Sequence, residues 1–199
     1  MQNFNTHPEI IPESSMFWGK AVDEIACHPV LAAYFRRIEE VVLPGICRLL
    51  NFFRSNGLRV VFLTKGCELA EGNDWRVPSQ VGRGPHRGSF GAAVCPEVAP
   101  KEDELVVHRP TSDVFNSSAL AHTLRFWDTD TLFFAGVGTS ACVEGSARHA
   151  ADIGYKCVLI EDCCAIFHPE DHYSTLRIFA RYFGMVSTSA GIIALLGER

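Results

Sequence analysis

The 199-residue sequence lacks several features that would assign it to a compartment or a class of partner. No apolar run is long enough to cross a membrane, and the N-terminus lacks the basic-then-apolar order of a secretory signal peptide. No block of like charge occurs, and a net charge of −5 disfavours nucleic acid or an anionic membrane as a partner. We therefore expect a cytoplasmic protein that binds neither membranes nor nucleic acid.

Cysteine spacing typical of a metal or redox site is also missing. None of the eight cysteines is arranged as C-x-x-C, and a chain of this length can build a core without disulfides. The thiols are therefore expected to be reduced and mostly buried. A hydrophobic content of 47% and a charged content of 21% are those of an ordinary globular protein, and the length predicts one domain over residues 1–199.

Strand and helix patterns alternate along the chain, which predicts an α/β fold with a mostly parallel sheet covered on both faces. The loop-rich stretch 65–104 is long enough to suggest a functional role. The expected strands are 58–64, 105–108, 131–136, 157–160 and 184–187. The expected helices are two pieces within 31–56, then 116–126, 143–154, 174–183 and a last one ending near 196.

Cys142 is the most informative residue, because it stands where a helix begins, directly after a buried strand and a glycine-containing turn. The N–H groups and the dipole at a helix N-terminus favour negative charge, so the thiol pKa should fall and a bound oxyanion would be stabilised. The same position also suits a small buried core residue.

The turn before Cys142 also fits a dinucleotide-binding fingerprint. Gly136-x-Gly138-x-x-Ala141 follows a strand and opens a helix, and Glu161 and Asp162 end the next strand, where a ribose-binding acid belongs. The unit lies late in the chain, however, and few residues remain to complete a dinucleotide-binding domain. A dinucleotide-dependent oxidoreductase is therefore a secondary hypothesis.

The segment around Cys142 resembles the signature of the isochorismatase-like cysteine hydrolases. Its residues are Gly136-Val-Gly-Thr-Ser-Ala-Cys142-Val-Glu-Gly-Ser-Ala-Arg-His-Ala-Ala-Asp-Ile-Gly-Tyr155. The likeness extends to 42–50, 53–60, 105–115 and 183–186, from about residue 40 onward. It is nearest to the amidohydrolase branch, which includes N-carbamoylsarcosine and ureidoacrylate amidohydrolases.

The resemblance implies a three-layer α/β/α sandwich around a Rossmann-like, six-stranded parallel sheet. It implies a cysteine hydrolase of a small amide, carbamoyl or ureido group, acting without a cofactor and assembled as a homo-oligomer. Cys142 would be the nucleophile, with a cis peptide between Val137 and Gly138. The amides of Gly138 and Cys142 would form the oxyanion hole.

The sequence departs from this family at two catalytic positions. The family lysine is replaced by Arg109, which keeps the positive charge but cannot surrender a proton. The family's first strand and its catalytic aspartate are absent, since the chain begins Met1-Gln-Asn-Phe4. Three explanations stay open: a shortened start, another segment in the gap, or a non-catalytic member that binds or scaffolds. Asp23, Glu24 and Asp113 are candidate substitute acids, and each also fits a surface charge.

No metal site is expected, because the loop that carries the metal ligands in nicotinamidase-type members contains only His86 here. The pair His168 and His172 is assigned to a solvated helix start. Cationic and aromatic side chains near a thiol suit a small anionic or carbamoyl substrate. The candidate substrate-binding residues are Trp75, Arg76, Arg87 and Phe115.

Overall fold

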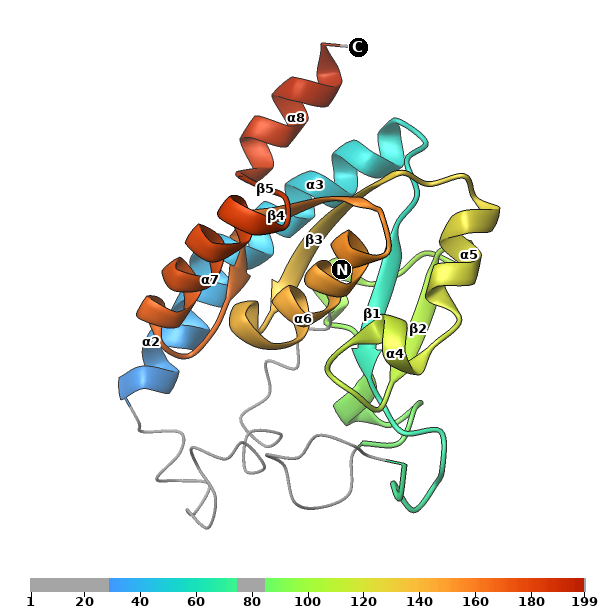
Figure 1. Cartoon of the computed structure of the whole chain (residues 1–199). Coiled ribbons are helices and arrows are strands. Elements are labelled where there is room, and N and C mark those ends of the chain that lie inside the picture. Colours follow the sequence, from blue (N-terminus) through green and yellow to red (C-terminus); the bar gives the residue numbers. More distant parts are fainter. Residues whose placement is uncertain (1–28, 75–84, 199) are drawn as a thin grey trace.

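The computed structural model describes residues 29–74 and 85–198, drawn in colour in Figure 1. Within them, helices and strands alternate and every strand ladder is parallel, which confirms the predicted α/β class. None of the helices in these ranges is long and apolar enough to cross a membrane. The expected absence of a first strand concerns residues 1–28, which lie outside the described part of the chain.

Among the described residues, five strands form two separate sheets. β1 pairs with β2, and β3 pairs with β4, which in turn pairs with β5. No ladder between described residues joins β1 to β3. The strands are β1 (Val61–Lys65), β2 (Leu105–Arg109), β3 (Thr131–Val137), β4 (Lys156–Ala165) and β5 (Met185–Ser187).

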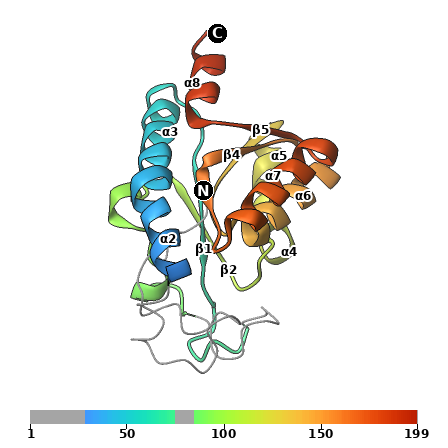
Figure 2. The same cartoon turned by 90° about the vertical axis from the view of Figure 1, so that its left-hand side faces the viewer.

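The helices cover both faces of the strands, which gives the three layers seen edge-on in Figure 2. One face carries α2 (Pro29–Arg37), the π-helical turn η2 (Ile38–Val42), α3 (Leu43–Ser55) and α8 (Ser189–Gly197). The other carries α4 (Val114–Ser117), α5 (Leu120–Phe126), α6 (Glu144–Asp152) and α7 (Pro169–Tyr182). The loop before β2 holds the 3-10 turns η3 (Phe90–Ala92) and η4 (Pro96–Val98).

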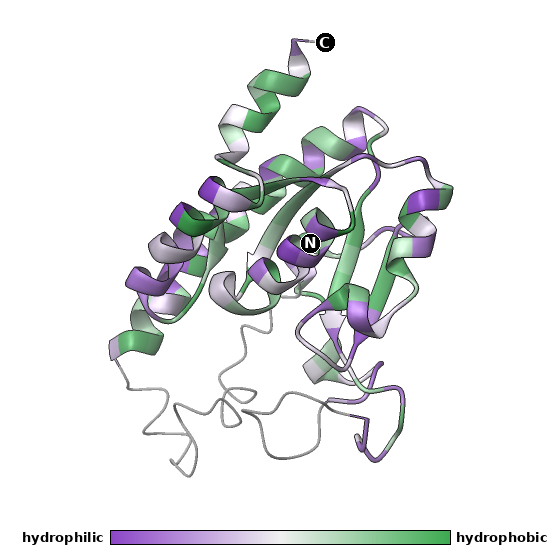
Figure 3. Cartoon of the chain, in the orientation of Figure 1, coloured by the Kyte–Doolittle hydropathy of each residue, from purple (hydrophilic) through white to green (hydrophobic). Residues whose placement is uncertain are grey.

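Alternation along the strands divides the core between the two faces. Phe62 and Ala135 pack into the cluster under α3, whereas Leu63 and Phe134 pack toward the helices of the opposite face. Figure 3 accordingly shows strands that are hydrophobic along most of their length, between helices of mixed polarity. This is the pattern expected of parallel strands that are buried on both sides.

Local hydrogen bonds explain where the elements differ from the sequence-based expectation. The predicted helix 116–126 is two helices, because the Asp113 side chain accepts a hydrogen bond from Phe115 N (2.9 Å) and starts α4 early. The Ser118 hydroxyl then accepts one from Leu120 N (3.2 Å) at the start of α5. β4 continues to Ala165, past its predicted end at residue 160.

Gly184 provides a test of the packing beneath β5. A Cβ at this position would lie 2.2 Å from the Cys157 carbonyl oxygen, a backbone atom that cannot swing aside. Gly184→Ala should lower the free energy of unfolding by about 1–3 kcal/mol, measured by urea denaturation. Gly145→Ala in α6, where a Cβ meets nothing within 4 Å, is the matched control and should be neutral or slightly stabilising. Equal losses in both variants would contradict the packing at Gly184.

Candidate active site

Cys142 lies at the carboxyl end of β3, in the π-helical turn η5 (Thr139–Val143) that leads into α6. Two glycines shape the chain just before it. Gly136 has a φ of 125°, which a residue with a side chain rarely adopts, and the Val137–Gly138 peptide is cis. A Cβ on Gly138 would lie 2.4 Å from Ile166 Cδ1. The positive φ therefore accounts for Gly136, whereas a side chain at Gly138 would have to displace the end of the Ile166 side chain.

The start of η5 presents backbone N–H groups near the thiol. The amides of Ala141 and Val143 both donate to the Gly138 carbonyl, at 3.2 Å each. The first amides of a helix have no carbonyl partner within it, so they are suited to a developing negative charge. The amides of Ala141 and Val143 are already engaged with Gly138, and the oxyanion hole at Gly138 and Cys142 stays a prediction.

Arg109 brings a positive charge into the interior at the end of β2. Only 1% of the residue is exposed, and one guanidinium N–H donates to the Thr111 carbonyl. Its Nε has no hydrogen-bond partner among the described residues. A buried cation is costly unless a negative group compensates it, so this guanidinium favours an anion beside it.

The Cys142 thiol is that neighbouring group. Cys142 is 3% exposed, and burial alone would raise its pKa. The charges of Arg109 and Lys65, with hydrogen bonds to Arg109 and Ser112, outweigh burial, so the thiol pKa lies below its ordinary value. Burial raises the pKa of Cys157 to about 12, and it raises that of Cys164 to about 12 although the Arg37 charge and a backbone hydrogen bond at Gly136 act in the opposite direction.

A buried histidine supports the turn from behind. His172 is 3% exposed and its Nδ1 lies 2.9 Å from Thr139 Oγ1. Its Nε2 lies 3.1 Å from a guanidinium nitrogen of Arg37. Because guanidinium only donates, Nε2 must accept and Nδ1 must carry the proton that is donated to Thr139. Burial and the nearby Arg37 charge lower the His172 pKa to about 4, which keeps the ring neutral.

Arg37 contacts the His172 ring on the opposite nitrogen from Thr139. It also donates to the carbonyls of Glu161 (3.1 Å) and Cys164 (3.2 Å), so one side chain of α2 joins β4 to α7. The interpretation of His172 as part of a solvated helix start was therefore wrong. The i, i+4 spacing from His168 marked a helix surface, but it could not show that this face turns toward the interior.

The remaining candidate residues either make other contacts or lie outside the described part of the chain. Arg87 forms a 2.6 Å ion pair with Glu68, and about half of each side chain is exposed. Phe115 packs against the rings of His149 and Tyr155, with centroids 5.5 and 6.3 Å away. Trp75, Arg76, Asp23 and Glu24 lie outside the described residues. The substrate-binding role of Trp75, Arg76, Arg87 and Phe115 therefore stays a prediction.

Asp113 is already engaged elsewhere. Besides capping α4, its carboxylate lies 2.6 Å from Nδ1 of His149 on α6. It is therefore a structural group that joins α4 to α6. No group of three or more potential metal ligands occurs within the described ranges.

Comparison with known proteins gives a consistent family assignment. A model of the isochorismatase domain matches residues 37–191. Maleamate amidohydrolase from Pseudomonas putida is 29% identical over 119 residues, covering 60% of this chain and 56% of the relative. The ureidoacrylate amidohydrolase RutB of Acinetobacter baylyi is 26% identical over 144 residues, covering 72% of this chain and 54% of the relative. The chain thus spans just over half the length of these curated relatives.

Solved structures share the fold. A cysteine hydrolase from Pseudomonas syringae pv. phaseolicola aligns with a TM-score of 0.73 and 24% identity, covering 86% of this chain and 87% of that protein. Nicotinamidase PncA from Bacillus subtilis aligns with a TM-score of 0.64 and 24% identity, covering 77% and 86%. At this level of identity the two structures establish the architecture alone.

The lowered pKa of Cys142 predicts selective alkylation. At pH 6.5, iodoacetamide should modify Cys142 before the other cysteines, because thiolate is the reactive form. Mass spectrometry of tryptic peptides gives the site and the rate. Arg109→Met should slow the Cys142 reaction by about tenfold, since one pKa unit changes the thiolate fraction tenfold at this pH. Arg125→Met, on the exposed side of α5, is the control and should leave the rate unchanged.

The lowered pKa of His172 predicts that the stability of the fold depends on pH. Between about pH 6.5 and about pH 4 the unfolded chain holds a proton on this residue and the folded chain does not. Stability should therefore fall as pH drops through this window. His172→Gln should flatten that fall, measured as Tm at pH 7 and pH 4.5, while His122→Gln, at an exposed position, should not. An unchanged slope in His172→Gln would argue against a buried neutral ring.

Proposed function

The chain belongs to the isochorismatase family, and on that premise we propose that it hydrolyses an amide-type C–N bond of a small molecule through Cys142. The observation that carries the proposal is a buried thiol beside a buried guanidinium, at a helix start that follows a parallel strand. A lowered thiol pKa and local N–H groups are the two requirements of a thiolate nucleophile.

In the proposed reaction the Cys142 thiolate attacks the substrate's carbonyl carbon. The carbonyl oxygen takes the negative charge and accepts hydrogen bonds from the amides of Gly138 and Cys142. The C–N bond then breaks, the nitrogen leaves with a proton, and a thioester remains on sulfur. Water attacks the thioester, releasing a carboxylic acid and restoring the thiolate.

Arg109 supplies the charge that holds the sulfur as thiolate. It cannot supply the proton that the leaving nitrogen needs, because a guanidinium stays protonated at any working pH. Within residues 29–74 and 85–198, no carboxylate forms an ion pair with Arg109 that could serve as the proton shuttle. The proton is therefore assigned to another acid or to water.

The proposed substrate carries an amide, carbamoyl or ureido group. Two relatives support this class through their names, maleamate amidohydrolase and ureidoacrylate amidohydrolase. Trp75, Arg76, Arg87 and Phe115 remain the proposed substrate-binding residues. A homo-oligomer in the cytoplasm is part of the same proposal, and the apolar helix α8, with Leu195 half-exposed, offers a surface for self-association.

A binding or scaffold protein is the second candidate function. The observation that favours it is the absence of a carboxylate at Arg109 and Cys142 among the described residues. No described group is then positioned to give the leaving nitrogen its proton. In that case the site would hold an anionic ligand without turnover, and ligand binding rather than product release would be the measurable event.

Ammonia release from maleamate and ureidoacrylate tests the proposal. Cys142→Ala should abolish release, whereas Cys47→Ala, a partly exposed cysteine on α3, should not change it. Arg109→Lys should retain most activity because it keeps the charge, and Arg109→Met should lose about a hundredfold in kcat/KM. Ammonia release that persists in Cys142→Ala would overturn the mechanism. Ligand-induced thermal stabilisation without release would favour the binding candidate.

A further inference from the structure

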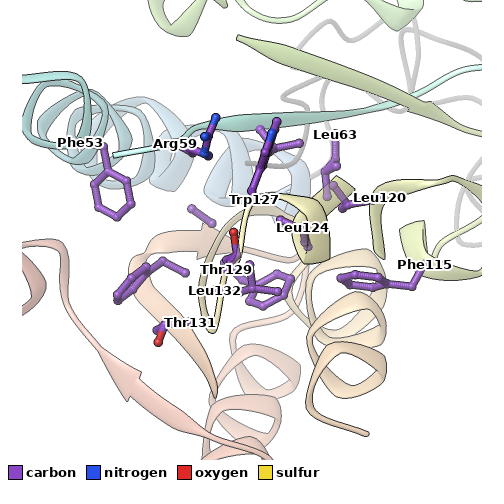
Figure 4. Close-up of a pocket in the computed structure, with 14 residues that line it drawn as sticks. Phe53, Arg59, Leu63, Phe115, Leu120, Leu124, Trp127, Thr129, Thr131 and Leu132 are labelled. Carbon is purple, nitrogen blue, oxygen red and sulfur yellow. The ribbon is translucent and has the colours of Figure 1, made fainter. Parts of the chain in front are cut away.

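The β2–α4 loop, residues 110–113, leads from the end of β2 to the start of α4 and runs beside α6. Its far end is anchored in the core, because Val114 is fully buried and Phe115 lines the apolar pocket shown in Figure 4. Its near end is tied to the site, because the Arg109 guanidinium donates to the Thr111 carbonyl. The loop therefore connects the core to the cation beside the thiol.

Three side chains of one helix face this loop. Cys142, Ser146 and His149 follow one another at intervals of four and three residues, the spacing of side chains that share one helix face. The first and the last of them contact the loop through their side chains. The Ser112 side chain hydrogen-bonds the Cys142 sulfur, and His149 Nδ1 lies 2.6 Å from the Asp113 carboxylate.

Ser146 holds the middle of this contact and is completely buried. Its hydroxyl oxygen accepts a hydrogen bond from Val114 N (3.2 Å), and the hydroxyl donates to the Ser112 carbonyl oxygen, 3.5 Å away. A buried hydroxyl is costly without partners, so the two bonds also hold Ser146 in one orientation. Because one hydroxyl bridges both residues, it fixes the backbone on either side of Asp113.

The backbone that Ser146 holds carries the hydrogen-bond donors of the thiol. Ser112 supplies its own side chain, and the preceding residue, Thr111, accepts the N–H of Arg109. A displacement of this backbone would move the Ser112 hydroxyl and the Arg109 guanidinium together, relative to the sulfur. Hydrogen bonds weaken steeply when their angle is lost, so the strength of both contacts depends on what fixes the loop.

We propose that Ser146 is a positioning residue of the site, which aligns Ser112 and Arg109 on the Cys142 sulfur by clamping the β2–α4 loop to α6. This inference rests on the proposed function, in which that sulfur is the nucleophile. A serine with only a structural role would satisfy Val114 N, a donor in the first turn of α4 that has no partner within the helix. It would then affect the stability of the fold and leave the chemistry of the thiol unchanged.

The pH dependence of Cys142 alkylation distinguishes the two roles. In Ser146→Ala the midpoint of the iodoacetamide rate profile should rise by about one pH unit, which slows the reaction at pH 6.5 about tenfold. Ser146→Thr keeps the hydroxyl and should restore the original midpoint. Mass spectrometry of the Cys142 peptide separates this rate from those of the other cysteines.

The change in midpoint reports alignment, because Ser146→Ala removes no charge. Arg109 and Lys65, which lower the Cys142 pKa, are both retained. So is Tyr34 of α2, whose pKa is raised by burial and by the charge of Cys142.

Ser118→Ala is the matched control. Ser118 makes the same two kinds of bond at the end of α4, donating to the Val114 carbonyl (2.8 Å) and accepting from Leu120 N (3.2 Å). Its loss should lower Tm by about 2–4 °C, as the loss of Ser146 should, and should leave the midpoint unchanged.

Ser112→Ala keeps the test decisive if Ser146→Ala does not fold. Ser112 is only partly buried, and the variant removes the hydroxyl that Ser146 aims at the sulfur, so the midpoint should rise. An unchanged midpoint in Ser112→Ala would overturn the proposal on its own. The double variant should raise the midpoint by less than the sum of the two shifts, because Ser146 acts in part through Ser112.

Two further results would contradict a positioning role. An unchanged midpoint in Ser146→Ala, with Tm lowered, would make Ser146 a structural residue. Equal shifts in Ser146→Ala and Ser118→Ala would mean that any loosening of α4 is sufficient. In an active enzyme Ser146→Ala should also lower kcat about tenfold with little change in KM. If the unmodified protein releases no ammonia, the proposed function fails, whereas the alkylation profiles still decide the role of Ser146.

Discussion

A buried guanidinium next to a buried thiol is the interaction around which the carboxyl end of the sheet is organised. Arg109 ends β2, and Cys142 follows β3 by a short turn. Parallel strands bring their carboxyl ends to one edge of a sheet, which is where α/β proteins place their reactive groups. The Arg109 charge would be costly in that position without a negative partner. A thiolate at Cys142 would relieve this cost, which is why the contact lowers the thiol pKa.

The turn that carries Cys142 is anchored by a buried hydrogen bond. The His172 ring holds Thr139 through a hydrogen bond whose direction is set by Arg37. Anion-stabilising amides are effective only when they are already oriented before charge develops. His172 holds Thr139 better as a neutral ring than as a cation, because a positively charged His172 would be repelled by Arg37.

Much of the fold and the position of the thiol could be predicted from sequence, because short apolar runs and glycines leave strong local signals. The strand before Cys142, the helix after it and the placement of Arg109 at a strand end are examples. Burial of a polar side chain leaves no such signal. His172 looked like a surface residue, and Asp113 like a free acid, until the contacts with Arg37, Thr139 and His149 were visible.

Among the described residues β1 and β3 belong to separate sheets, and the expectation of an absent first strand concerns residues outside that part of the chain. The pairing of β1 with β2 nevertheless has a direct consequence for the thiol. Its register places Lys65 opposite Arg109 at the carboxyl ends of the two strands. Both cations lower the Cys142 pKa. The register of this strand pair therefore sets the charge around the thiol, because a shift of one residue would move one of the two cations away from that edge.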